Sequence, residues 1–302
     1  MNQSRLGDRS FTISNTVILT IFAFLCMYPF WYILILSLNE GRDAALGSLY
    51  WWPRVFTLDN YRVMLSDPAI INAFWVTVKR TVIGTFGSLI VTSLVAFALS
   101  RKELPGRKQL LLLFLFIMLF SGGLIPFYLQ LYHLGLLNNF WVYVIPSLFS
   151  VWNMFVMKTS FQNSIPENVI ESVKLDGGGY VRVYFHIVLP FSVPLFAALG
   201  LFTAVGLWND WFTGAFYVSD LGLQPLPTYL QRMLSTIEAS QKISASSQMA
   251  MMNQTRLYNP DAITTKSVRM ATIMITMLPI LIVYPFLQRF FVKGVLIGSV
   301  KE

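Results

Sequence analysis

The chain has 302 residues, of which 55% are hydrophobic and only 12% are charged, and its net charge is +8. Since a typical soluble domain carries roughly 25% charged residues, this composition and the mean hydropathy of +0.61 exclude a disordered protein, a coiled coil and an ordinary soluble enzyme, and predict a polytopic membrane protein. In such a protein a positive excess usually reflects orientation and anionic lipid, so it does not indicate nucleic-acid binding.

Six apolar segments are long enough to cross a membrane, since a helical span needs about 20 apolar residues. They lie at about 11–38, 81–100, 110–132, 140–157, 191–209 and 270–288. Each is too long for a strand, and barrel strands would alternate in polarity, so we expect an all-α protein with six transmembrane helices. The first segment is too long for the apolar core of a signal peptide, and we predict a retained helix.

The second segment carries small residues at four-residue spacing, which would let another helix approach closely. They are Ser88, Thr92, Ala96 and Ser100. The two interpretations are packing within the chain and a contact with another subunit, and we favour the first.

Loop charges predict the orientation of these helices. The nine-residue loop 101–109 contains four cationic residues, and short basic loops stay in the cytoplasm. Both termini should then be cytoplasmic, with a leading segment 1–10 and a tail 291–302 on either side of the transmembrane domain 11–290. The loop 218–269 should be external, and because its length is unusual it could be a docking surface rather than a solvated loop.

The segment 162–190, between the fourth and fifth spans, is too polar to cross a membrane but is clearly patterned. Ser164-Ile-Pro-Glu167 fits a capping box, so a short helix should follow and extend to Leu175. Gly177-Gly178-Gly179 should end it, because three glycines carry a heavy entropic cost in a helix. A second helix should run over Tyr180–Val188. The spacing alone predicts an interfacial helix–glycine elbow–helix.

This elbow also carries a family signature. Glu171-Ser172-Val173 is followed after three residues by Gly177, and after nine more by Ile187-x-Leu189-Pro190. The spacing resembles the EAA signature of ABC importer permeases, with Ser172 and Val173 in place of its two alanines. Leu175-Asp176-Gly177 likewise resembles the usual L-D-G core.

The resemblance covers nearly the whole chain and narrows to one class. The chain is similar to the second permease of carbohydrate-uptake systems, the maltose-permease-like class, and especially to lipoprotein-dependent polysaccharide permeases. Permeases of alginate and pectin-fragment importers are similar. The segments behind this are 121–126, 135–138, 207–212 and 284–298.

The resemblance implies a type I ABC importer permease fold in a bacterial cytoplasmic membrane. Its partners would be a second homologous permease, two ATPase subunits and an extracytoplasmic sugar-binding protein. The elbow would couple the chain to the ATPase, with Glu171 as polar anchor and Gly177 as tight turn; without the motif, Glu171 would be a solvated carboxylate. The ATPase-coupling residues are Glu171, Ser172, Asp176, Gly177, Ile187, Leu189 and Pro190.

No phosphate-binding loop motif occurs, so the partner ATPase would bind ATP and Mg and hydrolyse the ATP. We expect no cofactor or metal in this chain. The two histidines, His133 and His186, belong to no catalytic motif, so the chain is predicted to be no enzyme. Cys26 is the single cysteine and can form no internal disulfide.

Candidate substrate contacts lie at the end of the fifth span. In Trp208-Asn209-Asp210-Trp211, aromatic faces could pack on sugar rings while Asn and Asp bond hydroxyls. The alternative is that these tryptophans form the interfacial belt. Asn153, in the fourth span, should face other helices or a cavity. By position, the loop 218–269 matches the external loop that reaches into the binding protein in maltose-type permeases.

Two alternatives for the function remain at this point. An ion-coupled carrier needs ionisable groups within its spans, and only Asp210 comes close. An ABC permease for a non-sugar solute would carry the same elbow. Six arginines predicted to be external suit an acidic oligosaccharide, although scattered surface charge explains them equally well. They are Arg42, Arg54, Arg62, Arg232, Arg256 and Arg269.

Overall fold

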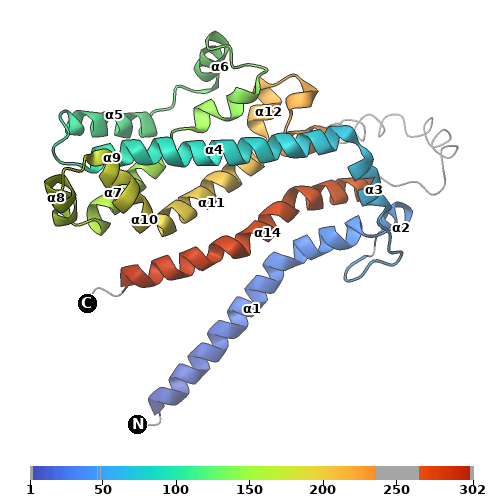
Figure 1. Ribbon diagram of the computed structural model, residues 1–302. Helices are drawn as coiled ribbons and strands as arrows, with labels where there is room; N and C mark the ends of the chain where they lie inside the picture. Colours follow the sequence, from blue (N-terminus) through green and yellow to red (C-terminus); the bar gives the residue numbers. More distant parts are fainter. Residues whose placement is uncertain (1–2, 46, 48, 236–264, 300–302) are drawn as a thin grey trace. The chain divides into compact units, whose positions relative to one another are not determined.

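The computed structural model describes residues 3–45, 47, 49–235 and 265–299 (Figure 1). Residues 236–264 of the predicted external loop, Arg256 among them, lie outside the described residues. Internal contacts divide the chain into two compact units, one formed by Met1–Pro68 with Arg232–Leu278 and the other by Ala69–Gln231 with Pro279–Glu302.

In the first unit, a buried amide joins two of the helices. Its helical segments are α1 (Gln3–Ser37), α2 (Gly41–Ala45), α3 (Asp59–Ser66) and the first part of α14 (Thr265–Ser299). The side-chain amide of Asn60 donates to the carbonyls of Ser37 and Asn39, at 2.9 Å each, and so fastens α3 to the end of α1. Most described side chains of α1 are apolar and exposed, so they are available to lipid or to another chain.

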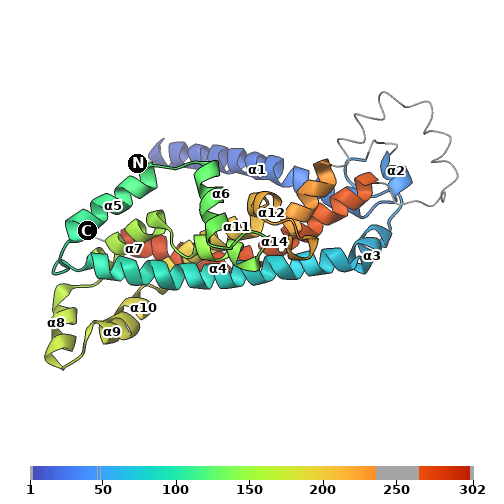
Figure 2. The same ribbon diagram turned by 90° about the horizontal axis from the view of Figure 1, so that it is seen from above.

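The second unit is built around α4, a helix of 33 residues, and α4 runs next to α11 (Figures 1 and 2). Its main helices are α4 (Pro68–Ser100), α5 (Arg107–Leu119), α6 (Leu124–His133), α7 (Val151–Ser164), α11 (Val193–Asn209) and α12 (Phe212–Tyr217). Glycines allow the close approach of α4 and α11, because a Cβ at Gly84 would lie 2.7 Å from Leu207 and one at Gly200 would lie 3.1 Å from Leu89. Side chains of each helix therefore rest on the backbone of the other.

Four described helices are long and apolar enough to cross a membrane, and two bent helix pairs raise the number to six if each pair is one span. The segment 110–132 is one such pair, since α5 ends at Leu119, α6 begins at Leu124 and the two are bent by 114°. The break falls beside Gly123, whose φ of +87° is a conformation that glycine adopts without steric cost. The apolar pattern of this segment gave no sign of the bend.

Two other segments differ in extent from the expected spans. Helix α4 begins at Pro68 rather than near residue 81, so Lys79 and Arg80 lie inside the helix and not at its border. The segment 140–157 begins with two short 3-10 turns and becomes α-helical only at Val151.

The small residues of α4 pack within the chain. Thr92 accepts a hydrogen bond from the backbone N–H of Ser150, at 3.2 Å, just before α7 begins. The interpretation of this stripe as internal packing is therefore confirmed. All four of its residues are buried: Ser88, Thr92, Ala96 and Ser100.

Replacing Gly214 tests the packing of α12. A Cβ at Gly214 would overlap the Thr228 hydroxyl and lie 2.9 Å from Cδ of Pro225. We expect Gly214→Ala to destabilise the chain by about 1–3 kcal/mol through overpacking. The measurement is the thermal unfolding midpoint of the purified chain in detergent.

The control is Gly206→Ala in α11, where no atom lies within 4 Å of the added Cβ. This variant should melt at or above the wild-type temperature, because alanine favours a helix over glycine by about 1 kcal/mol. Equal midpoints for the two variants would contradict the packing described for α12.

Candidate functional site: the elbow and the end of α11

The first half of the elbow is α8 (Glu167–Leu175), and it starts differently from the capping box that the sequence suggests. Ser164 is the last residue of α7, and Pro166 occupies the N-cap position without a side-chain hydrogen bond. The carboxylate of Glu167 instead lies 3.5 Å from Nζ of Lys102. The capping-box prediction is wrong because the two residues it would join belong to different helices and Glu167 has another partner.

The glycines end α8 in a Schellman motif. Gly177 has a φ of +77°, its N–H donates to Lys174 O at 3.0 Å, and the N–H of Gly178 donates to Val173 O at 2.8 Å. These bonds satisfy carbonyls that the end of a helix leaves without partners. A Cβ at Gly178 would lie 2.9 Å from Val173 O, whereas Gly179 has no atom within 4 Å of this position. The turn therefore needs glycine at 177 and 178, each for a separate reason.

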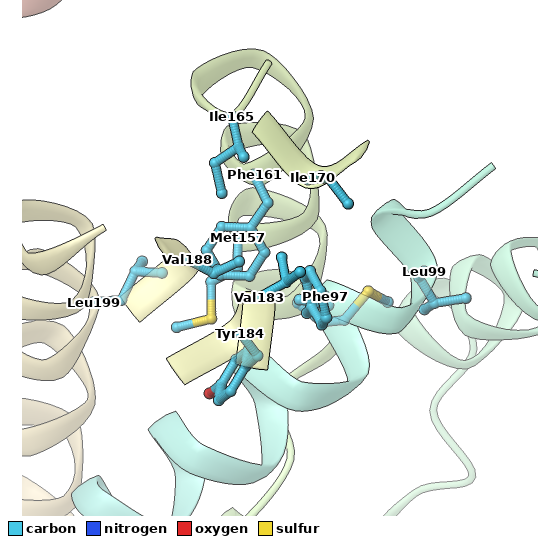
Figure 3. Close-up of a cluster of buried hydrophobic side chains, with 12 residues drawn as sticks. Phe97, Leu99, Met157, Phe161, Ile165, Ile170, Val183, Tyr184, Val188 and Leu199 are labelled. Atoms are coloured by element: carbon cyan, nitrogen blue, oxygen red, sulfur yellow. The ribbon is translucent and has the colours of Figure 1, made fainter. Parts of the chain in front are cut away.

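The second half of the elbow is embedded in the core of the second unit. It consists of α9 (Tyr180–Val183), a π-helical turn (Tyr184–Val188) and α10 (Leu189–Phe191). Figure 3 shows Val183, Tyr184 and Val188 among side chains of α4 and α7. The Tyr184 hydroxyl also bonds the Ser93 hydroxyl of α4 at 2.6 Å. Ile187 and Leu189 of the signature pack against this cluster, so their half of the motif anchors the elbow.

The other half of the signature is on the surface. Glu171, Ser172, Asp176 and Gly177 are all exposed. The side chain that sequence reasoning missed is Leu175, which is 89% exposed one helical turn after Glu171 on the same face. Leu175 is part of the Leu175-Asp176-Gly177 core, but the motif alone does not show that its side chain is exposed.

The basic loop 101–109 is tied to the elbow. The Lys174 ammonium lies 3.4 Å from the Glu103 carboxylate and donates to the Tyr180 hydroxyl at 2.8 Å. The bond to Tyr180, and less strongly the Glu103 carboxylate, raise the pKa of Lys174. With the contact between Lys102 and Glu167, two polar contacts hold this loop against α8. The loop and the elbow therefore lie on the same side of the second unit.

The proposed substrate contacts occupy two separate places. Asn153, in α7, donates to the Thr203 hydroxyl of α11 at 3.3 Å, so its amide serves contact between helices. Trp208 is buried, with its ring 6.1 Å from that of Phe74, whereas Trp211 is 40% exposed. At the end of α11, Asn209 is exposed and Asp210 is partly so.

Asp210 has a partner that sequence reasoning missed. Its carboxylate accepts from the backbone N–H of Thr213 at 3.1 Å and lies 3.8 Å from Nη1 of Arg80. Arg80 stands beside an apolar run, which made it look like a flanking charge, and only its burial in the fold reveals the contact. Within the described residues, no group of three or more His, Cys, Asp or Glu side chains could hold a metal ion.

Residues 109–297 match the family described as binding-protein-dependent transport system inner membrane component. The polygalacturonan/rhamnogalacturonan transport system permease protein YtcP of Bacillus subtilis is 37% identical over 98% of this chain and all of that protein. Protein LplC of Bacillus subtilis is 36% identical over all of this chain and 98% of its own length. In the crystal structure of a bacterial ABC transporter that imports the acidic polysaccharide alginate, one chain is similar with a TM-score of 0.82 and 28% identity, covering 94% of this chain and 98% of that one.

Alanine at Gly177 and at Gly179 isolates backbone strain, because both positions have open space for a Cβ and only Gly177 has a positive φ. Gly177→Ala should loosen the elbow, because a non-glycine residue at positive φ costs about 1–2 kcal/mol. Gly179→Ala should leave it nearly unchanged, since Gly179 has an ordinary φ of −82° and open space around it. Amide hydrogen exchange over residues 167–188 is the measurement, and equal exchange in the two variants would contradict the assigned turn.

Proposed function

Because this chain belongs to the family of binding-protein-dependent transport system inner membrane components, we propose that it helps to import oligosaccharides that an extracytoplasmic binding protein delivers. The chain is a permease subunit of an ABC importer, a multi-pass protein of the bacterial inner membrane, and not an enzyme. The expected family and the type I permease fold are confirmed. ATP and Mg belong, in this proposal, to two partner ATPase subunits, and a second permease completes the pathway.

Acidic polysaccharide fragments are the proposed cargo. The observation that carries this is the 37% identity over 98% of the chain to a polygalacturonan/rhamnogalacturonan permease, and the alginate importer points the same way. Both names refer to polymers of uronic acids. The external arginines add little, because Arg54 is bonded to Asp43 and Arg62 to Asp59 within the chain.

The elbow 162–190 is the proposed contact with the ATPase. Its exposed carboxylate and leucine, Glu171 and Leu175, would enter a cleft of the ATPase, while the buried half transmits displacement to α4 and α7. In this proposal the elbow, the basic loop 101–109 and both termini lie on the cytoplasmic side. The external loop 218–269 would then meet the binding protein on the opposite side.

The substrate pathway is proposed to run past the exposed groups at the end of α11. Asn209, Asp210 and Trp211 can offer hydroxyl partners and an aromatic face. Trp208 would support them from within the fold. The pairing of Asp210 with Arg80 disfavours an ion-coupled carrier, because the carboxylate already has a cationic partner.

Uptake by a reconstituted complex tests the cargo. Proteoliposomes that contain this chain, its partner permease and the ATPase should take up trigalacturonate in the presence of ATP and the binding protein. We expect uptake to exceed that of neutral maltotriose by more than about tenfold, because a site built to bind a polar group discriminates against an analogue without it. Preference for maltotriose, or for a peptide or polyamine, would reject the acidic-oligosaccharide assignment.

Substitutions on α8 test the coupling surface. Glu171→Gln and Leu175→Ala should each lower sugar-stimulated ATPase activity and uptake by about tenfold, the effect of removing one interface contact of roughly 1–2 kcal/mol. The matched control is Glu167→Gln on the same helix, whose carboxylate faces Lys102 of this chain. Wild-type stimulation in both Glu171→Gln and Leu175→Ala would place the ATPase contact elsewhere.

A further inference from the structure

Arg80 is a fully buried arginine inside a membrane-spanning helix. Its side chain is 0% exposed in α4, whose neighbouring residues are mostly apolar. A charged group in such a place is costly and is retained where it has partners and a role. The elbow mechanism does not involve this residue, which lies toward the other end of α4 from the elbow cluster.

The partners of Arg80 are carbonyls at the end of α11. Nη2 donates to Asp210 O at 2.6 Å and to Trp208 O at 3.3 Å. These groups lie at the C-terminal end of α11, where carbonyls lack partners and the helix dipole is negative. The guanidinium also lies 5.2 Å from the ring centre of Tyr143. Arg80 therefore caps α11 from a neighbouring helix.

The same part of α4 holds the base of the external loop, residues 218–228. The Thr77 hydroxyl, one turn before Arg80, accepts from the N–H of Leu226 at 2.8 Å, and the Asn72 amide donates to Gly222 O at 2.6 Å. The Tyr143 hydroxyl donates to Leu223 O at 3.0 Å, while its ring lies beside Arg80. The end of α11 and the loop base are thus bonded to one stretch of α4.

A second connection joins the two segments directly. The Thr228 hydroxyl donates to Trp211 O at 2.8 Å, just after the end of α11. Asn138 then fixes the start of the loop base, because its side-chain oxygen accepts from the N–H groups of Ser219 and Asp220 at 3.1 and 2.7 Å. The loop base is therefore a fixed part of the second unit.

From this arrangement we propose that Arg80 is a positioning residue that makes the end of α11 and the loop base 218–228 move as one body. When the loaded binding protein contacts the external face near the loop base, the resulting displacement then also moves Asn209–Trp211 on the substrate pathway. This inference rests on the proposed docking of a binding protein. Arg80 touches no substrate, and its action is exerted through the backbone of α11.

The planar guanidinium suits this role better than an ammonium group. Nη2 of Arg80 donates to both carbonyls, while Nη1 lies 3.8 Å from the Asp210 carboxylate and, like Nε, makes no hydrogen bond among the described residues. Lysine could place its single charge near the two carbonyls, but it could not direct a second nitrogen toward Asp210 at the same time. Lysine should therefore restore part of the function of arginine, and methionine of similar length should restore none.

The test uses the full complex in lipid nanodiscs, with ATPase activity measured while the binding protein loaded with trigalacturonate is titrated. In Arg80→Met we expect basal ATPase activity and assembly close to wild type. Stimulation by the binding protein should fall by about tenfold, a factor within the range that coupling between two sites usually produces. Arg80→Lys should fall between the two. The control is Lys79→Met, the neighbouring cation of α4, which is exposed.

A second variant, Thr77→Val, keeps the test possible if Arg80→Met does not fold. Thr77→Val keeps the shape of the side chain and the cap on α11, but removes the acceptor of the Leu226 N–H. It should also reduce stimulation while leaving basal activity unchanged. Reduced stimulation in both variants, with Lys79→Met like wild type, supports the inference.

Two different results would contradict the inference, one for Arg80 alone and one for the proposed docking as well. If Arg80→Met lowers basal and stimulated activity equally, or only lowers the melting temperature, and Thr77→Val behaves as wild type, then Arg80 is a stability anchor alone. If the loaded binding protein does not stimulate the wild-type complex, the proposed docking and cargo fail first, and the role of Arg80 fails with them.

Discussion

The second unit depends on hydrogen bonds that α4 makes through side chains, because the membrane interior offers no water to satisfy polar groups. Thr77 and Arg80 bond backbone groups of residues 208–226, Thr92 bonds the backbone before α7, and Ser93 bonds Tyr184 of the elbow. Each bond fixes the position of a different segment along one helix. The apolar packing between these points could slide, but the polar pairs specify its register.

The elbow separates residues that pack in the core from residues that are free to contact a partner. Its buried half shares a core with α4 and α7, where even a small volume change is felt, so a displacement of the elbow moves both helices. In its other half, Ile170 still packs in this core, while Glu171 and Leu175 project to the surface from a short helix that ends in a glycine turn. Exchange of the exposed residues can therefore tune a partner contact at little expense in stability.

The sequence predicted the helical class, the elbow and its break, because apolar run length and consecutive glycines are local signals. It could not predict the bend between α5 and α6, since a glycine pair permits a positive φ without requiring one. Arg80 was missed for a different reason. A cation next to an apolar run marks a membrane border in most proteins, and only the contact with α11, 130 residues away in the chain, places it inside.

The position of the polar pairs along α4 also bears on how the two ends of the permease communicate. The Ser93–Tyr184 bond and the Arg80–Asp210 bond are 13 residues apart on α4, or roughly 20 Å at 1.5 Å per residue. Between them, Gly84 and Gly200 let Leu207 and Leu89 pack against the backbone of the facing helix, which resists sliding. If the elbow contacts the ATPase as proposed, a displacement there would reach the end of α11 as a rigid-body movement of this helix pair.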